Sequence, residues 1–319
     1  MLCHFILSIY FVNSLASVSL HIEDYDHNFV GDPDVFIIGN QKGGTTSLSS
    51  LLTDQLGYFV ESFGRKEPHF FDALFDDQFF TAYVAGFRNE RQKRGTDVLT
   101  LDATPAFFRN DFAVYRVEKL YSPDCLRQKK FVLILREPVN RDFSWFVNLY
   151  GECKKRDSPL CPQPGGEQFH DTFHDYVERN YRKGTFVSDG FALHHLKRLL
   201  SVIPRDQVFI INFESLTDER QQETLNRLFY FLGVPPKYSA DPLMPHSNHK
   251  ENHCEEHCED WHQHKVLCSD IRFLNEMYSN ANKGLLDFIN SGLNRPASEP
   301  IFGPYSESFP LACVEDENQ

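Results

Sequence analysis

Short apolar runs alternate along the chain with longer segments in which apolar residues recur every three or four positions. Continuous apolar runs are typical of strands buried on both faces. Such runs occur at Asp34–Gly39, Asp97–Leu101, Lys130–Leu135 and Gln207–Asn212. Helical spacing extends over Thr45–Leu56, 111–121, 139–150, 187–200, 217–232 and 265–289. Because strands alternate with helices, the sequence predicts an α/β fold, a single domain in which helices cover both faces of one parallel sheet.

The two ends of the chain depart from this pattern. Residues 1–20 contain an apolar stretch followed by small side chains, without any Asp, Glu, Lys or Arg. This order is typical of a secretory signal peptide, and a type II signal anchor is the alternative. Residues 291–319 are rich in Pro and Ser and end in acidic residues. We therefore expect one folded domain over 33–290, followed by an acidic tail.

The net charge of the chain limits the kinds of molecule that it can bind. The chain carries 32 Lys and Arg against 45 Asp and Glu, a net charge of −13, which excludes a protein that holds nucleic acid by its overall field. Only the N-terminal segment is apolar enough to contact a membrane. Basic stretches occur at Arg88–Arg94, Lys129–Lys130 and Lys154–Arg156. Each is either a solvated loop or part of a local patch for an anionic partner.

Cysteine and histidine usage points to disulfides or to a metal. Cys153 and Cys161 bracket a loop rich in Pro and Gly, as a disulfide in an oxidising compartment would. In residues 246–264, His and Cys recur at a spacing of four, which suits zinc ligands, but the acidic residues between them fit a solvated face equally well. A disulfide is the third possibility. Its candidate cysteines are Cys254, Cys258 and Cys268.

The turn after the first predicted strand has the composition of a phosphate-binding loop. Residues 40–47 read Asn-Gln-Lys-Gly-Gly-Thr-Thr-Ser and lead directly into a predicted helix. Two glycines let backbone N–H groups approach a phosphate, and the helix start adds partial positive charge. The loop differs from the nucleotide-triphosphate motif, because Thr45 occupies the lysine position and Lys42 precedes the glycine pair. An ordinary strand-to-helix turn is the alternative.

A second anion site is predicted after the run at 130–135. Arg136 stands at the end of that strand, where its planar guanidinium can bind a phosphate. Ser144 follows two helical turns later and can donate to the same oxygens. Pairing of Arg136 with a neighbouring carboxylate is the alternative.

Together these elements resemble the Golgi carbohydrate sulfotransferases, which use 3′-phosphoadenosine 5′-phosphosulfate (PAPS). Two further segments carry the resemblance, Lys66–Asp72 (KEPHFFD) and Leu101–Phe108 (LDATPAFF). The resemblance spans about residues 33–290 and implies a P-loop-like fold. It implies that Arg136 and Ser144 hold the 3′-phosphate. The residues implied at the 5′-phosphosulfate are Lys42, Gly43, Gly44, Thr45, Thr46 and Ser47.

The resemblance also implies the chemistry. Sulfuryl transfer needs an in-line geometry, positive charge at the leaving oxygen and a base for the attacking hydroxyl. Lys42 is expected at the leaving oxygen and Glu67 is the expected base, with His69 as the competing base. An ion pair of Glu67 with Lys66 or Arg65 is the structural alternative. No metal is expected. The expected acceptor is a sulfated or acidic glycan, in the Golgi lumen or outside the cell.

Some positions depart from the branch pattern. Ala103 stands where heparan 3-O-sulfotransferases have a lysine, and the run from Arg136 to 212–214 looks closer to N-acetylgalactosamine 4-sulfate 6-O-sulfotransferases. Lys250, in the stretch 246–252, is expected to complete the PAPS site. Two alternatives stay open: a secreted protein that binds PAPS without turnover, and a P-loop kinase acting on a small molecule. The missing Gly-Lys-Ser/Thr order argues against the kinase.

Overall fold

Five parallel strands form one sheet in the order β2-β3-β1-β4-β5. The computed structural model describes residues 32–62, 66–95, 98–156, 172–183, 189–235, 266–291, 295–296, 299 and 313. The strands are Val35–Gly39 (β1), Phe59–Glu61 (β2), Leu99–Asp102 (β3), Lys130–Leu135 (β4) and Val208–Asn212 (β5). The sheet confirms the α/β fold and the four strands expected from apolar runs. The short edge strand β2 was missed.

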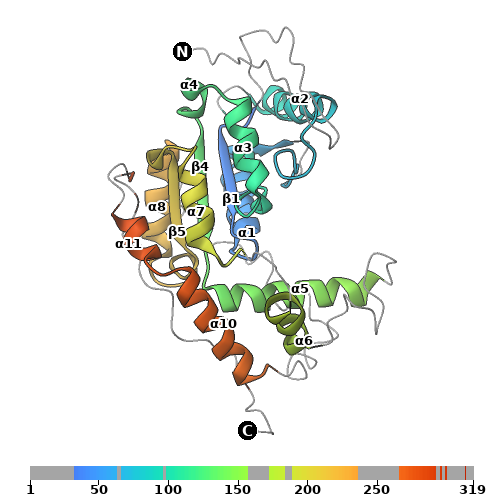
Figure 1. Cartoon of the computed structure of the whole chain (residues 1–319). Coiled ribbons are helices and arrows are strands. Elements are labelled where there is room, and N and C mark those ends of the chain that lie inside the picture. Colours follow the sequence, from blue (N-terminus) through green and yellow to red (C-terminus); the bar gives the residue numbers. More distant parts are fainter. Residues whose placement is uncertain are drawn as a thin grey trace.

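Helices connect the strands and lie around the sheet (Figure 1). Between β1 and β5 they are α1 (Thr45–Ser50) with its π-helical extension η1 (Leu51–Gln55), α2 (Asp77–Arg94), α3 (Asp111–Leu120), α4 (Pro123–Leu126), α5 (Pro138–Arg156), α6 (Phe173–Val177) with η4 (Glu178–Arg182), and α7 (Ala192–Leu200). After β5 come α8 (Gln221–Leu232), α10 (Cys268–Ala281) and α11 (Leu285–Asn290). Short 3₁₀ turns lie at Pro105–Phe107 (η3), Arg205–Gln207 (η5) and Phe213–Leu216 (η6).

One expected helix was wrong, and another helix had not been predicted. The helical pattern over 265–289 is divided into α10 and α11, because Gly284 adopts a left-handed conformation with φ of 83° between them. Helix α2 was missed altogether, although its buried side chains have helical spacing. These side chains are Phe80, Tyr83, Val84 and Phe87.

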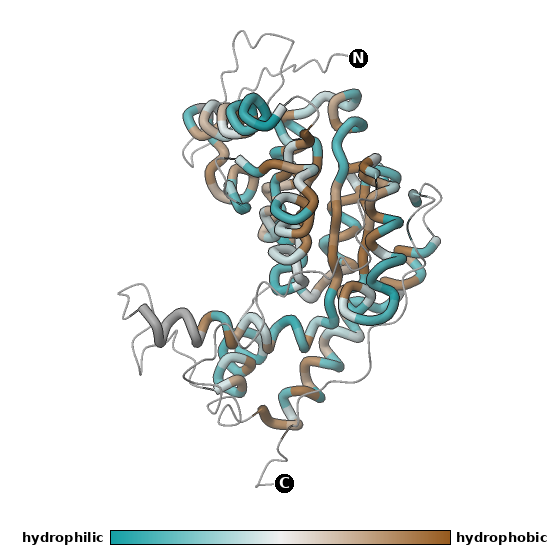
Figure 2. Tube along the Cα trace, turned by 180° about the vertical axis from the view of Figure 1, so that it is seen from behind, coloured by the Kyte–Doolittle hydropathy of each residue, from teal (hydrophilic) through white to brown (hydrophobic). Residues whose placement is uncertain are grey.

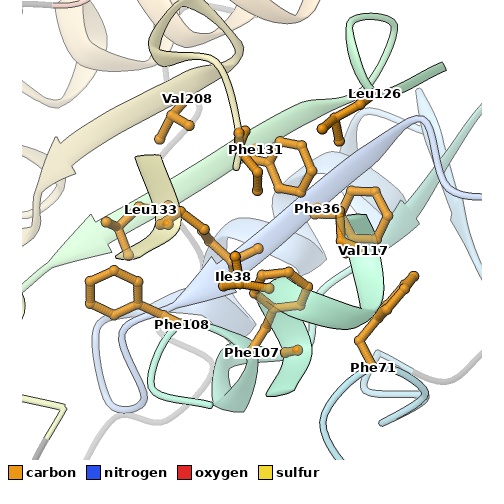
Figure 3. Packing of buried hydrophobic residues seen from close by; sticks show 14 of the residues in the cluster. Phe36, Ile38, Phe71, Phe107, Phe108, Val117, Leu126, Phe131, Leu133 and Val208 are labelled. Carbon is orange, nitrogen blue, oxygen red and sulfur yellow. The ribbon is translucent and has the colours of Figure 1, made fainter. Parts of the chain in front are cut away.

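Both faces of the sheet are buried, which explains why whole strands are apolar. Phe36 and Ile38 of β1 point to the face covered by α3 and α7, whereas Val35 and Ile37 point to the face covered by α1 and α8. Figure 3 shows the first of these layers, in which Phe36 stacks on Phe131 of β4 with ring centroids 5.0 Å apart. In Figure 2 the strands accordingly run as hydrophobic tubes through the middle of the molecule.

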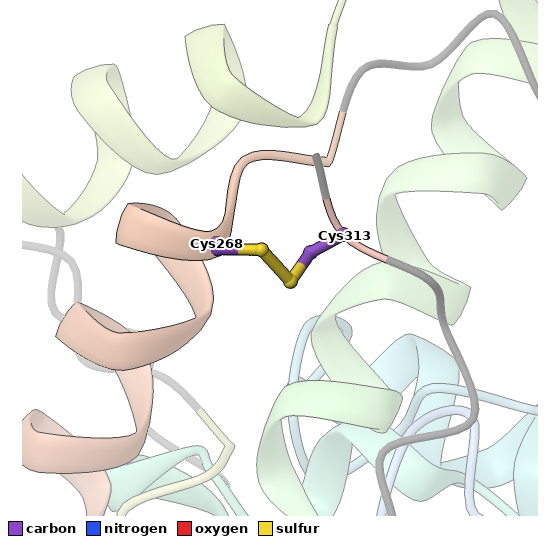
Figure 4. The surroundings of a disulfide bond; sticks show 2 residues. All are labelled: Cys268 and Cys313. Atoms are coloured by element: carbon purple, nitrogen blue, oxygen red, sulfur yellow. A yellow bond between two sulfur atoms is a disulfide. The ribbon is translucent and has the colours of Figure 1, made fainter. Parts of the chain in front are cut away.

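A smaller helical layer extends from the end of β4. Helices α5, α6 and α10 pack together there around a separate apolar cluster that includes Phe146, Phe173 and Leu274 (Figure 1). A disulfide joins Cys268, at the start of α10, to Cys313, with Cα atoms 5.0 Å apart (Figure 4). Cys268 is thus one of the predicted disulfide cysteines. Within the described ranges, no helix combines the length and apolarity needed to cross a membrane.

Several expectations lie outside the described residues. They concern the N-terminal segment 1–20, the loop bracketed by Cys153 and Cys161, most of the tail 291–319, and the His- and Cys-rich stretch 246–264. They stay predictions.

Candidate active site

The predicted phosphate loop is the turn that joins β1 to α1. Lys42 and Gly44 have φ values of 65° and 87°, so the backbone is left-handed on both sides of Gly43. A Cβ atom on Gly43 would lie 2.9 Å from the Asn40 carbonyl oxygen and 3.1 Å from that of Ile134. Gly43 is therefore needed because the loop backbone approaches β4 too closely for a side chain. Thr45, Thr46 and Ser47 form the first turn of α1.

Arg136 contacts this loop directly. Its Nη1 atom donates a hydrogen bond of 2.9 Å to the Lys42 carbonyl oxygen, and its guanidinium lies over the Phe213 ring, 4.6 Å from the centroid. Burial lowers the pKa of Arg136, with Glu214 and Glu137 acting against it, and the guanidinium stays charged at neutral pH. The structure therefore brings the two predicted anion-binding elements together through a carbonyl oxygen and an aromatic ring rather than a carboxylate.

The Lys42 side chain reaches toward α5. Its Nζ atom donates to Asn148 Oδ1 at 2.9 Å. Asn148 lies one helical turn after Ser144, so both residues occupy the same side of α5. Asn148 was missed from the sequence, and its spacing of four from Ser144 is the signal that could have found it.

A network of buried charged side chains contacts the backbone of the 40–47 loop. The Gln41 backbone N–H donates to Asp189 Oδ2 at 3.3 Å, and Arg141 Nη1 lies 3.7 Å from the same oxygen. Arg141 also forms an ion pair of 2.8 Å, from Nη2 to Asp142 Oδ1. The side chains of Arg141, Asp142 and Asp189 are at most 1% exposed. This network links the loop to α5 and to the turn before α7.

Two tyrosines complete the network. Tyr181 donates to Asp142 Oδ2 at 2.7 Å, and Tyr278 of α10 donates to the same oxygen. A Cβ atom on Gly190 would lie 2.4 Å from the Tyr278 ring, so this glycine lets α10 approach the turn at residues 189–190, before α7. Arg141 and Asp142 lie between the predicted site residues Arg136 and Ser144 in the sequence. Nothing in the sequence indicates that these two charged side chains are buried.

The segment that carries Glu67 and His69 lies at the end of the neighbouring strand β3. The Ala103 backbone N–H donates to the Lys66 carbonyl oxygen at 3.1 Å. The Glu67 carboxylate forms an ion pair with Lys66 and lies 3.5 Å from His69 Nε2. His69 Nδ1 is 2.9 Å from Asp72 Oδ2. The Glu67–Lys66 ion pair expected as the structural alternative is therefore present, together with a histidine contact.

These contacts set the protonation states. Burial acts to raise the pKa of Glu67, but hydrogen bonds from His69 and Lys66, with their charges, outweigh burial and lower it. Hydrogen bonds to Asp72 and Glu67 raise the pKa of His69 to about 10. At neutral pH, Glu67 is therefore ionised and can accept a proton, whereas His69 already carries one.

The acidic residue of the Leu101–Phe108 segment has a structural task. Asp102 Oδ1 accepts hydrogen bonds from the backbone N–H and the hydroxyl of Thr104, at 3.0 and 2.6 Å, and Oδ2 accepts one from Tyr83 of α2 at 2.7 Å. Burial raises the pKa of Asp102 to about 6, against the opposing effect of these hydrogen bonds. Asp102 therefore ties α2 to the end of β3, close to the Glu67 segment.

The fold and the loop define an α/β protein of the P-loop-like class, in which the residues predicted to bind anions follow β1 and β4 and contact one another. A family model described as the sulfotransferase domain matches residues 32–267, which is more than half of the chain. The chain belongs to the sulfotransferase domain family.

Similar proteins agree with this assignment. Two curated relatives, from Caenorhabditis elegans and Caenorhabditis briggsae, are both named bifunctional heparan sulfate N-deacetylase/N-sulfotransferase 1. The first is 24% identical over 208 residues, 64% of this chain and 22% of the relative. The second is 25% identical over 214 residues, 64% of this chain and 23% of the relative. The matched region thus spans less than a quarter of the length of these relatives.

A solved structure shows the same fold. The crystal structure of a sulfotransferase from Alicyclobacillus acidocaldarius superposes with a TM-score of 0.55 at 21% identity, covering 82% of this chain and 96% of that one. The likeness supports the P-loop-like arrangement of the sheet and its helices.

Proposed function

We propose that this chain transfers the sulfonate group of PAPS to a hydroxyl group of a glycan. The observation that carries the proposal is the hydrogen bond from Arg136 to the Lys42 carbonyl oxygen. It fixes the guanidinium that would bind the 3′-phosphate relative to the loop that would bind the 5′-phosphosulfate. Two anion sites held at a constant separation suit a donor with phosphates at both ends of its ribose.

The loop fits a phosphosulfate group. Gly43 has no room for a Cβ atom, and its neighbours Lys42 and Gly44 are left-handed, a backbone shape that suits an anion-binding turn. The N–H groups of Gln41 and Gly43 donate to Asp189 and Asn40, so the phosphosulfate would be bound by the part of the turn that leads into α1. Thr45, Thr46 and Ser47 place hydroxyl groups on the first turn of α1. Lys250, assigned to the same donor from the sequence, lies outside the described residues.

Each residue would have one task in the reaction. Bound PAPS supplies an activated sulfonate group. Lys42 neutralises the charge that develops on the leaving phosphate, while Arg136 and Ser144 hold the 3′-phosphate. Glu67 accepts the proton of the acceptor hydroxyl. At the same time the hydroxyl oxygen forms a bond to sulfur, and the bond from sulfur to the phosphate oxygen of PAPS breaks.

A glycan acceptor is supported by two observations. The Lys66–Asp72 segment resembles the Golgi carbohydrate branch, and the nematode relatives are named for heparan sulfate. Such an acceptor would place the protein in the Golgi lumen or outside the cell, where the Cys268–Cys313 disulfide would persist.

One observation favours a second function, a protein that binds PAPS without turnover. The Glu67 carboxylate already contacts Lys66 and His69, and its lowered pKa makes it a weaker base. In that case the chain would bind PAPS tightly and transfer no sulfonate.

The deciding experiment is transfer of radiolabelled sulfonate from PAPS to a panel of chondroitin, dermatan, heparan and desulfated glycans. We expect label on at least one glycan, and its loss in Lys42→Ala and Glu67→Ala variants. PAPS binding without label on any glycan would contradict the proposal and support the second function.

The pairing of His69 predicts a specific dependence on pH. Because the pKa of His69 is raised from 6.5 to about 10, its stabilisation is complete below pH 6.5 and is lost as the pH rises through about 10. We expect His69→Gln to reduce the unfolding free energy at pH 6 and to change it little near pH 11. Urea unfolding at several pH values measures this difference.

The same variant reports on Glu67. Without the hydrogen bond and charge of His69, the pKa of Glu67 should rise. In a plot of kcat/KM against pH, the acidic limb should therefore move to higher pH. His194→Gln, at an exposed position of α7, is the matched control. Parallel pH profiles for the wild-type protein and His69→Gln would show that His69 does not control this site.

A further inference from the structure

Helix α3 exposes a stripe of aromatic and basic side chains that the core does not use. We call Phe112, Tyr115, Arg116 and Lys119 the α3 stripe; they occur at i, i+3, i+4 and i+7 and so lie along one side of the helix. Phe112 is 67% exposed and Tyr115 is 40% exposed. The opposite side of the helix packs on the sheet. Its buried residues are Ala113, Val114, Val117 and Leu120.

Cation–π contacts join the side chains of the α3 stripe to one another. Lys119 Nζ lies 5.1 Å from the Tyr115 ring centroid, and the Arg116 guanidinium lies 5.8 Å from that of Phe112. The same guanidinium is 5.2 Å from the ring of Phe75, in the loop before α2. Each ring of the stripe is therefore paired with a cation one helical turn later.

The charge of the α3 stripe is available to an anionic ligand. Neither Arg116 nor Lys119 forms an ion pair with a carboxylate of the described residues. Arg116 and Lys119 are half-buried, and the charge of the Asp72 carboxylate acts on Arg116 from the loop before α2. Two acidic side chains of α3 also lie nearby: Asp111 pairs with Arg198 of α7, and Glu118 is exposed beside the stripe.

The α3 stripe is continuous with the segment that carries Glu67 and His69. Arg116 Nη1 donates to the Phe71 carbonyl oxygen at 2.6 Å, two residues after His69. Asn110, the N-cap of α3, donates from Nδ2 to the Asp72 carbonyl oxygen at 3.0 Å, and the Asp72 carboxylate holds His69. A ligand on the stripe would therefore extend from the proposed acceptor site.

We propose that the α3 stripe is an accessory binding site for the acceptor, in which an anionic segment of the glycan beyond the reacting sugar is bound. Phe112 and Tyr115 would pack against the apolar faces of sugar rings, and Arg116 and Lys119 would pair with sulfate or carboxylate groups. This site rests on the proposed function, because it assumes that the acceptor is a glycan chain.

The test compares a double variant, Phe112→Ala with Tyr115→Ala, and the single variant Lys119→Gln with the wild-type full chain. Tyr230→Ala is the matched control, since Tyr230 of α8 is an aromatic residue that is 78% exposed. Arg116 is left intact because it also holds the Phe71 backbone. The probes are heparan and chondroitin sulfate tetrasaccharides and decasaccharides, in a direct binding titration and in sulfonate transfer from PAPS.

We expect the double variant to weaken decasaccharide binding about tenfold and to raise the acceptor KM by a similar factor, as the loss of two stacking contacts would. Tetrasaccharide transfer, kcat and PAPS affinity should change little, and Tyr230→Ala should behave like the wild-type protein. Decasaccharide binding that depends on the stripe, without any transfer, would support this site while contradicting the proposed function.

Three outcomes would overturn the site. In the first, sulfonate transfer occurs and the double variant binds both oligosaccharides as the wild-type protein does. In the second, the wild-type chain binds neither oligosaccharide, which would also argue against a glycan acceptor. In the third, the double variant changes self-association in sedimentation or binding to lipid vesicles while glycan binding stays the same.

Discussion

Replacing Lys42 by Ala should reduce kcat by about 10²- to 10³-fold, the effect of removing one group that stabilises charge in the transition state. The Lys42 ammonium is the positive charge of the 40–47 loop. Under the proposed function it would be needed most as charge builds on the leaving phosphate. Affinity for PAPS should fall less than kcat, because under the proposed function Arg136, held against the loop, would bind the donor in the ground state as well. Single-turnover transfer of labelled sulfonate and equilibrium PAPS binding measure the two effects separately.

The substitution can be made without disturbing the loop backbone. Lys42 has φ of 65°, and alanine bears about the same conformational strain there as lysine does. Asn148→Ala is the matched control, since it removes one hydrogen-bond acceptor of Lys42 Nζ and keeps the charge. We expect that variant to lose less than about tenfold in kcat. A Lys42→Ala protein with kcat within tenfold of wild type would contradict the assignment of Lys42 to the leaving oxygen.

Replacing Asp142 by Ala should lower the free energy of unfolding by about 3–5 kcal/mol. Asp142 is fully buried and pairs with Arg141, whose side chain is 1% exposed. Removing the carboxylate would take away the shorter of the two ion pairs described for the buried Arg141 guanidinium and leave the hydroxyls of Tyr181 and Tyr278 without their shared acceptor. Urea unfolding of the wild-type and variant proteins at neutral pH measures the loss.

An exposed ion pair provides the comparison for Asp142. Glu223 and Arg227 pair one turn apart on the surface of α8, so Glu223→Ala should cost less than about 1 kcal/mol. Asp142→Ala should also weaken PAPS binding, because Arg141 lies against the Asp189 carboxylate that holds the Gln41 backbone. Equal losses of stability in the two variants would contradict a buried charge network beneath the loop.

The sequence predicted the parts of the site that are contiguous along the chain. The apolar run that becomes β1 ends at the loop containing Lys42 and Gly43, and the run that becomes β4 ends at Arg136. Parallel strands place their carboxyl ends at one edge of the sheet, so these residues could be expected to meet. In the structure they do meet, through the hydrogen bond from Arg136 to the Lys42 carbonyl oxygen.

Other features depend on packing between segments that are distant in sequence. Asp189 lies 148 residues after Gln41, and nothing in its local sequence marks it as a buried acceptor for the loop. The role of Asp142 likewise needs tyrosines from two other segments. The type of a charged residue does not reveal whether its side chain is solvated or paired in the interior, so only the structure shows its environment.

The sequence by itself determined the class of fold and the positions of the 40–47 loop and Arg136 at the ends of two strands, because strand burial and turn composition are local properties of the chain. Only the tertiary structure decided that Lys42 reaches Asn148, that Glu67 is held between Lys66 and His69, and that Cys268 pairs with Cys313. These contacts arise where separate helices and loops pack against the end of one sheet, and that packing is a property of the whole fold.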